Sequence, residues 1–296
     1  VDASKSDTEM VEAKDSYTVA MIYQDLSQEF NIYFQNVMST RCAEAGITLL
    51  EFDGRSDTET QLNQCENAIA SGADALLFIP FDKDGAAPII DNCNEAGIPV
   101  ICCNNITTNV DQATAYVGAN DVEAGIMETE YIVDLIGGKG NIAVVEGPFG
   151  HSAQVARQEG LEQVLAGYPD CKIVLDDTAN WNRDEAMELV ENWIAGGTQI
   201  DAIICHNDIM AMGALQACQD AGLEIPIIGI DATYDALCAV KDGTLAADVY
   251  QDVYGQAEEA FNVCMRILNG ETFEQTTYVP FKLITKDNVD EYLANF

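Results

Sequence analysis

The sequence predicts an α/β fold of two similar lobes, each built on a doubly wound parallel sheet. Short strands rich in Val, Ile and Leu alternate with amphipathic helical stretches almost from end to end, which is typical of parallel sheets covered by helices on both faces. Ten such strands are more than one sheet of this chain length comfortably holds. A fresh strand–helix series opens at Ala119–Asn120, so we expect two lobes joined by a three-strand hinge, with a ligand cleft between them.

The expected strands are short apolar runs separated by helical stretches of a dozen or more residues. In order they are TVAMIY, ITLLEFD, DALLFIP, PVICCN, AYVG, NIAVVEG, KIVLDD, DAIICHN, PIIGID and LAADVYQ. Glycine follows several of the helices, as expected where a helix ends in the left-handed conformation: Gly46, Gly72, Gly97 and Gly222. The helix QDVYGQAEEAFNVCMRILNG returns to the first lobe, and the tail TTYVPFKLITKDNVDEYL crosses again near Pro280.

These crossings define the expected domains. Residues 17–118 with 252–279 form the N-terminal lobe, and residues 119–251 with 280–296 form the C-terminal lobe. Residues 1–16 are polar, acidic and without periodicity, so they predict a flexible tether. No signal peptide is visible and the chain opens on Val1. We therefore expect an exported protein on the outer face of the membrane or in the periplasm, lipid-anchored through a removed N-terminal segment.

The charge of the chain excludes two classes of partner. Among 296 residues there are 50 acidic and 13 basic side chains, which give a formal net charge of −37. Nucleic acid and anionic membrane surfaces both require Lys and Arg, so neither is an expected partner. The charge indicates a strongly solvated surface that resists association, and we expect a monomer. No apolar run reaches the roughly 18 residues of a membrane span.

The ten cysteines do not form a recognisable site. None lies in a C-x-x-C pair, and zinc spacing is absent. Most lie in apolar strands or on helical faces, which favours small buried side chains with free thiols. A disulfide between Cys42 and Cys65, on neighbouring helices, stays open. No metal and no cofactor are expected.

Three successive strands each end on one polar side chain. Asn207 follows IIC-His, Asp231 ends IPIIGID, and Gln251 ends LAADVYQ. Open α/β sheets bind ligands at the carboxyl ends of their strands. The sequence therefore predicts a row of hydrogen-bonding groups at a ligand site. Read singly, Asn207 could be only a helix N-cap and Asp231 only a turn residue.

Several segments together resemble a known family. HNDIMAMGALQACQDAG followed by IIGID is similar to its Q-N-D-x-M-A-x-G-A and V-G-x-D segments, GHSAQVARQEG to its loop-to-helix segment with a ligand-binding arginine, and ADALLFIPFDKDG to the strand-turn that enters the cleft. The chain resembles the ribose- and galactose-binding group of type I periplasmic binding proteins, the solute-binding components of bacterial ABC sugar importers. The resemblance covers Tyr17 to Lys286, in order and without large insertions.

The resemblance implies a set of ligand-binding positions. They are two stacking aromatics (Phe30 and Trp181), an arginine that forks onto sugar hydroxyls (Arg157) and three strand-end groups (Asn207, Asp231 and Gln251). A histidine typical of the glucose/galactose branch (His151) and two polar first-loop residues (Gln24 and Gln28) complete the set. Some positions depart from the family pattern. Asn104 and Asn105 stand where ribose binders carry Asp-Arg, Asn31 replaces the second of two phenylalanines, and the branch's calcium loop has no counterpart. Ala153 replaces an aspartate of that branch, and Ile79 a cleft asparagine.

These residue types suit a neutral sugar. Each hydroxyl that leaves water needs replacement hydrogen bonds; Asp231 accepts, Arg157 donates, and Asn207 and Gln251 do both. We expect Arg157 and Asp231 to offset each other's charge. The expected function is capture of a monosaccharide, a hexose first, by hinge closure and its delivery to a membrane ABC permease. Another small polyol (a pentose, furanose sugar or cyclitol) and a role in chemotaxis or two-component sensing are the alternatives.

An enzyme is not expected. G-x-S-x-G, a Walker A loop and a Rossmann G-x-G-x-x-G after a strand are all absent from the sequence. Glu146 and Asp231 could in principle form the carboxylate pair of a glycosidase, but both end strands of one lobe. A sugar-sensing repressor would carry a basic DNA-binding headpiece, where this chain has an acidic tether.

Overall fold

The computed structural model describes residues 16–294, so the expected tether lies almost wholly outside the described residues. The chain divides into two compact units. Within the described range, the N-terminal unit comprises residues 16–81, 85–117 and 254–277, and the C-terminal unit comprises residues 82–84, 118–253 and 278–294. Among these residues, no helix combines the length and apolar character needed to cross a bilayer.

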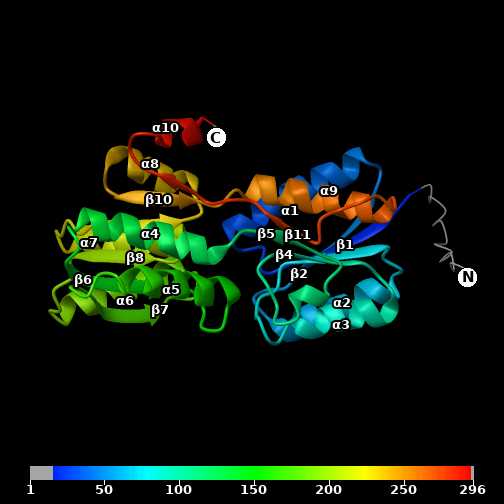
Figure 1. Cartoon of the computed structure of the whole chain (residues 1–296), viewed down its shortest axis with the longest axis horizontal. Coiled ribbons are helices and arrows are strands. Elements are labelled where there is room, and N and C mark those ends of the chain that lie inside the picture. Colours follow the sequence, from blue (N-terminus) through cyan, green and yellow to red (C-terminus); the bar gives the residue numbers. More distant parts are fainter. Residues whose placement is uncertain (1–15, 295–296) are drawn as a thin grey trace, which may run out of the picture. The chain divides into compact units, whose positions relative to one another are not determined.

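The N-terminal unit is built on a six-stranded sheet of order β11-β5-β4-β3-β1-β2. β1 pairs in parallel with β2 and β3, and β3 with β4. α1 and α9 cover one face of this sheet and α2 and α3 the other (Figure 1). The bounds are β1 Thr18–Tyr23, α1 Glu29–Glu44, β2 Thr48–Asp53, α2 Thr58–Ala70, β3 Ala75–Phe78, α3 Ala87–Ala96, β4 Val100–Asn104, η1 Val110–Gln112, β5 Ala115–Gly118, α9 Val253–Leu268 and β11 Thr276–Tyr278.

The C-terminal unit has a second six-stranded sheet, of order β12-β10-β9-β8-β6-β7. Its strands are parallel except that β12 runs antiparallel to β10. The bounds are α4 Asp121–Leu135, β6 Gly140–Glu146, α5 Ser152–Leu165, β7 Cys171–Thr178, α6 Arg183–Ala195, β8 Ala202–Cys205, α7 Asp208–Asp220, β9 Ile227–Ile230, α8 Tyr234–Asp242, β10 Ala247–Tyr250, β12 Lys282–Ile284 and α10 Val289–Leu293.

Alternate strand residues in the C-terminal unit feed two cores. Ile142, Val144 and Ile204 pack with side chains of α4 and α5, whereas Val145 and Ile203 pack with side chains of α6, α7 and α8. A parallel strand that is buried on both faces must be apolar on both, which is why these strands read as continuous hydrophobic runs. The predicted α/β class with two parallel-dominated sheets is confirmed. The tail adds two short strands, β11 and β12, where the sequence predicted only a crossing.

The predicted helix ends are confirmed. Gly46, Gly72, Gly97 and Gly222 all adopt positive φ, between 69° and 76°. Glycine takes this left-handed conformation without steric cost, so it stops the helix and lets the chain turn back towards the next strand.

α4 and α5 touch backbone to backbone, because each presents a glycine to the other. A Cβ built on Gly125 would lie 2.1 Å from the carbonyl oxygen of Arg157, and one on Gly160 would lie 2.3 Å from that of Val122. Real side-chain carbons never come so close. The two glycines therefore fix the distance between the helix that carries Arg157 and the helix that begins at Asp121.

The cysteines are free thiols, and nine of the ten are buried. Cys65 of α2 faces Cys93 of α3, with 3.8 Å between the two sulfurs. The pairing of Cys65 with Cys42 that the sequence left open is wrong, since Cys42 lies on α1, which covers the opposite face of the sheet (Figure 1).

Gly125→Ala is expected to lower the free energy of unfolding by about 1–3 kcal/mol, because overpacking forces α4 and α5 apart. Urea unfolding measures the change. Glu130→Ala, at an exposed position of the same helix, is the control and should stay within about 0.5 kcal/mol of the wild type. Equal stabilities of the two variants would contradict the close helix contact.

Candidate ligand-binding site

Arg157 is the centre of a buried network in the C-terminal unit. Its Nε donates to Oδ1 of Asp121 at 2.9 Å, and its Nη2 lies 2.8 Å from the same oxygen. Nη2 also donates to Oε1 of Gln251 at 3.2 Å, and Nη1 donates to the carbonyl oxygen of His206. α5, α4 and the ends of β8 and β10 are thus tied to one guanidinium, whose residue is only 4% exposed.

The donors of Arg157 are nearly used up. A guanidinium has five N–H groups, and the four contacts above occupy four of them. Within the described part of the chain, one N–H of Nη1 is left without a partner. Arg157 therefore has one directional donor to offer a ligand, and its charge is already compensated.

The carboxylate that compensates Arg157 is Asp121, not Asp231 as we expected from the sequence. Asp121 begins α4, where an acidic residue also suits the helix dipole. Burial raises the pKa of the Asp121 carboxyl, and the charge of Arg157 opposes that rise. Burial likewise raises the pKa of Glu128, two turns along α4, well above its usual range, which favours its neutral form.

Trp181 lies in the loop between β7 and α6 and packs on the backbone of Gly147. A Cβ on Gly147 would lie 2.1 Å from the indole ring, so only glycine admits the tryptophan there. The ring centroid is 5.9 Å from Cζ of Arg157 and 5.2 Å from the ring of His151, which meets it edge-on. Trp181 is 7% exposed and also belongs to a core cluster. Its expected stacking on a ligand stays a prediction.

Both histidines of the chain are buried and neutral. His151 is the N-cap of α5, where its Nδ1 accepts from the backbone N–H of Ala153 at 3.2 Å. His206 directly follows β8 and is fully buried, and neither of its ring nitrogens has a hydrogen-bond partner among the described residues. Burial, assisted by the charge of Arg157, lowers the pKa of each imidazole to about 3. The Nδ1 of His151 is thus occupied by the helix cap.

The three predicted strand-end residues lie along one edge of the C-terminal sheet, since β8, β9 and β10 are parallel neighbours. Asn207 is the N-cap of α7, and its Oδ1 accepts from the N–H of Met210 at 3.0 Å. The cap uses only the oxygen, and the described residues supply no partner for Nδ2. Asp231 is half-buried after β9, and Gln251 is buried after β10 beside Arg157.

A second polar group lies at the carboxyl ends of β1, β3 and β4 in the N-terminal unit. Nδ2 of Asn105 donates to Oε1 of Gln24 and to the carbonyl oxygen of Pro80, both at 2.8 Å. Oδ1 of Asn105 accepts from Nδ2 of Asn104 at 3.2 Å. The structure therefore joins three of the expected residues, and Asn104 adopts a left-handed φ of 57° that asparagine tolerates well.

The remaining expected residues lie at the start of α1. Gln28 is its N-cap but makes no side-chain cap hydrogen bond, Phe30 is half-buried, and Asn31 is 4% exposed with Oδ1 unpartnered among the described residues. Sequence reasoning missed Gln61, a fully buried residue of α2. Its Nε2 donates to the carbonyl oxygen of Ile79 at 2.8 Å, and its Oε1 accepts from the N–H of Phe81 at 3.0 Å, so it fixes the strand-turn after β3.

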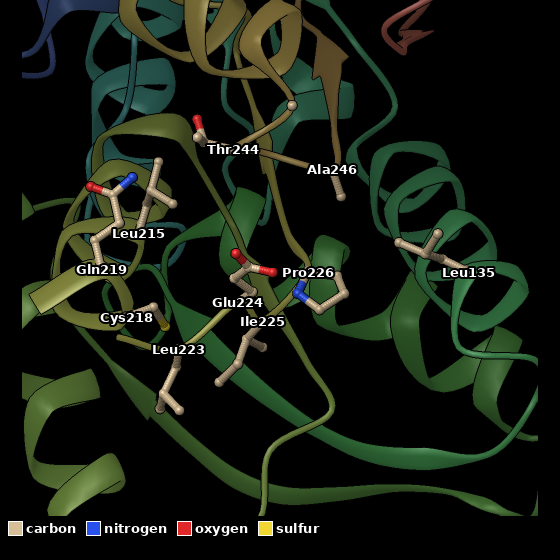
Figure 2. A pocket seen from close by; sticks show the side chains of 11 residues that line it. Leu135, Leu215, Cys218, Gln219, Leu223, Glu224, Ile225, Pro226, Thr244 and Ala246 are labelled. Carbon is tan, nitrogen blue, oxygen red and sulfur yellow. The ribbon is translucent and has the colours of Figure 1, made fainter. Parts of the chain in front are cut away.

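One further cavity belongs to the C-terminal unit but not to this edge. It has a volume of about 510 Å³ and is lined by residues 223–226, Thr244 and Ala246 (Figure 2). These residues precede β9 and β10, so the cavity lies at the amino ends of the strands. Within residues 16–294, no cluster of His, Cys, Asp or Glu side chains is arranged to hold a metal ion.

Comparison with known proteins places this architecture in a family. The periplasmic binding protein domain matches residues 19–272. The chain is 38% identical over 255 residues to a xylitol-binding protein of Mycolicibacterium smegmatis, an alignment that covers 86% of this chain and 73% of the relative. The chain belongs to the periplasmic binding protein family.

Solved structures agree with this assignment. An ABC transporter solute-binding protein from Bacillus halodurans with bound myo-inositol is 37% identical, with a TM-score of 0.92 over 95% of this chain and 98% of that one. A periplasmic solute-binding protein from Actinobacillus succinogenes with bound D-allose is 27% identical, with a TM-score of 0.86 over 93% and 100% of the two chains. The protein is thus an extracytoplasmic, non-enzymatic binding protein for a sugar or polyol, of the kind that serves ABC importers.

A pH dependence follows from His206. Its folded pKa of about 3 lies below the unfolded value of about 6.5, so unfolding takes up a proton below pH 6.5. The stability from this residue is present above pH 6.5 and is lost as pH falls. Relative to His206→Gln, the wild type should lose about 1.4 kcal/mol of unfolding free energy per pH unit below 6.5.

Urea unfolding of both proteins from pH 8 to pH 5 measures this difference. At pH 8 both imidazoles of the wild type are neutral in the folded and in the unfolded state. The difference in unfolding free energy between the two proteins at pH 8 is therefore the reference value. Two curves that stay parallel over the whole range would show that His206 is accessible to protons in the folded state.

Proposed function

We propose that this chain captures a neutral polyol, with a cyclitol of the myo-inositol type or an alditol favoured over a hexose, and delivers it to an ABC permease. The observation that carries the proposal is the state of Arg157. Its charge is compensated by Asp121, and one N–H of Nη1 has no partner among the described residues. A carboxylated ligand would require an uncompensated cation, whereas a hydroxyl needs only a donor and an acceptor.

The other polar groups of this edge are suited to hydroxyls. Asn207 offers the two N–H groups of Nδ2, while its oxygen is held by the cap. Asp231 adds an acceptor, and Trp181 adds an apolar ring face close to Arg157. Such a mixture can recognise vicinal hydroxyls, which each donate and accept.

The choice of a polyol rests on two further points. The hexose expectation relied on His151, whose Nδ1 is used to cap α5. Of the relatives described above, two are more than 35% identical to this chain. One is named a xylitol-binding protein, and the other was solved with bound myo-inositol. The structure with bound D-allose, at 27% identity, makes a hexose the second candidate.

The remaining expectations enter as part of this proposal. We predict that the hinge closes on the ligand, that the protein is a monomer and that it carries a lipid anchor. We also predict ligand contacts from six residues of the N-terminal unit: Gln24, Gln28, Phe30, Asn31, Asn104 and Asn105. A receptor for sensing could read the same ligand-bound form as a permease.

A thermal-shift screen tests the ligand class. Myo-inositol and xylitol should raise the melting temperature, because a ligand that binds only the folded state stabilises it by about 2.7 kcal/mol at 100 times its Kd. Hexoses and pentoses form the comparison set, and amino acids, nucleosides and sugar acids are the controls. A response to a hexose alone would favour the second candidate, and a response only to charged ligands would refute a neutral polyol.

Asn207→Asp separates the two roles of Asn207. Aspartate is an equally good N-cap, so the melting temperature should stay near the wild-type value. Loss of the Nδ2 donors should weaken binding of the screened ligand by roughly tenfold or more, since a buried hydroxyl loses its partner. Calorimetry measures the affinity.

Asn207→Ala is the matched control, because it removes both roles and should lower stability and affinity together. Unchanged affinity in Asn207→Asp would mean that Asn207 is only a helix cap.

A further inference from the structure

Two buried aspartates meet beneath the turn that carries Asp231. Asp208 is the first residue of α7 and is fully buried, and Asp248 lies in β10 with 1% exposure. The two carboxyls meet at Gly229 of β9, which lies opposite Asp248 in the sheet and where an added Cβ would come within 2.4 Å of Oδ1 of Asp208. One oxygen of each, Oδ1 of Asp208 and Oδ2 of Asp248, has no donor among the described residues. Two ionised carboxylates cannot bond to each other, so the pair is satisfied only when it holds a proton.

The other oxygens of the pair hold the turn between β9 and α8. Oδ2 of Asp208 accepts from the backbone N–H of Thr233 at 2.7 Å and from its hydroxyl at 3.0 Å. Oδ1 of Asp248 accepts from the N–H of Ala232 at 3.3 Å. The backbone N–H groups of two successive residues of the turn, Ala232 and Thr233, therefore both donate to the carboxyl pair.

The turn needs such support, because its backbone is strained. Asp231 and Ala232 have φ values of 128° and 62°, conformations that cost non-glycine residues of the order of 1–3 kcal/mol each. They persist only where neighbouring groups hold them. A relaxed turn would move the backbone of Asp231 and with it the carboxylate proposed to meet the ligand.

Gly229 provides the room for this arrangement. It lies opposite Asp248 in the sheet register, and a Cβ at Gly229 would come within 2.4 Å of Oδ1 of Asp208. Because Gly229 has no side chain, the carboxyl of Asp208 occupies that space and extends from α7 over the sheet towards Asp248.

We propose that Asp208 and Asp248 share one proton and act as positioning residues, which hold the β9–α8 turn so that Asp231 is oriented for the ligand. The role of Asp231 rests on the proposed function, but the holding of the turn does not. The proton comes from solvent and stays on the pair, so no bond to the ligand is made or broken.

The surroundings favour the singly protonated pair. Burial, followed by the charges of Asp248 and Asp231, raises the pKa of Asp208, and burial raises that of Asp248. The titratable groups that face the pair are Asp231 after β9 and the thiol of Cys205 at the end of β8. Both become anions when they ionise, so neither stabilises a second charge on the pair.

Asparagine substitutions test the shared proton at constant side-chain volume. In Asp248→Asn, the amide nitrogen can replace the proton-bearing oxygen and donate to Asp208, while the amide oxygen still accepts from Ala232. Asp208→Asn supplies the same single donor from the other side. In the double variant, two amides that both accept from the turn oppose their NH2 groups, which are both donors. If one amide rotates to accept from the other, its own NH2 group faces the N–H donors of the turn and that hydrogen bond is lost.

Hydrogen–deuterium exchange of the peptide that contains residues 231–233 is read first, on the ligand-free protein. Each single variant should exchange like the wild type, and the double variant roughly tenfold faster or more, because coupled groups are non-additive. Affinity for myo-inositol, measured by calorimetry, should follow the same order.

The outcomes separate the two proposals. If the double variant exchanges like the single variants, or if both single variants exchange as fast as the double, the shared proton is refuted. Faster exchange in the double variant with unchanged myo-inositol affinity would refute the positioning of Asp231. If the wild type does not bind myo-inositol, the proposed ligand fails, while the exchange data still decide whether the pair holds the turn.

Discussion

The ion pair between Arg157 and Asp121 is the interaction on which the C-terminal unit depends. Removing a charge from water costs several kcal/mol unless partners replace the lost solvation, and here the partners come from α4 and from the ends of β8 and β10. Gly125 and Gly160 let the two helices come close enough for the pair to form. The packing of α4 on α5, the ends of β8 and β10 and the candidate site therefore depend on one another. A ligand that meets this edge meets groups that are already fixed in place.

Much of the fold could be predicted from the sequence, because it depends on local signals. The alternation of apolar runs and helical stretches, with glycine after the helices, predicts the strands β1 to β10 and the parallel class. Asn207, Asp231 and Gln251 could be placed on one edge for the same reason, since parallel strands bring their carboxyl ends together. β11 and β12 were missed because their short runs gain their partners only from sheets formed by other parts of the chain.

The partners of the site residues could not be predicted. Asp121 is 36 residues from Arg157, and Asp208 is 25 residues from the turn at Thr233 that it supports. In the sequence each looks like one more acid at the start of a helix, which is an ordinary place for an acid. Burial gives them their roles, and single-sequence reasoning has no measure of which acids are buried in a chain with 50 of them. The same limit led Arg157 to be paired with Asp231.

The free thiols have a consequence for how this protein is made. The cores of its two units are closed by packing and by the polar networks at the strand ends, with no sulfur–sulfur bond between Cys65 and Cys93 or elsewhere in residues 16–294. Buried thiols react slowly, because oxidants and other thiols must reach them first. The chain can therefore mature without an oxidase or a disulfide isomerase. Its native structure requires no oxidising compartment, since all ten thiols are reduced in it.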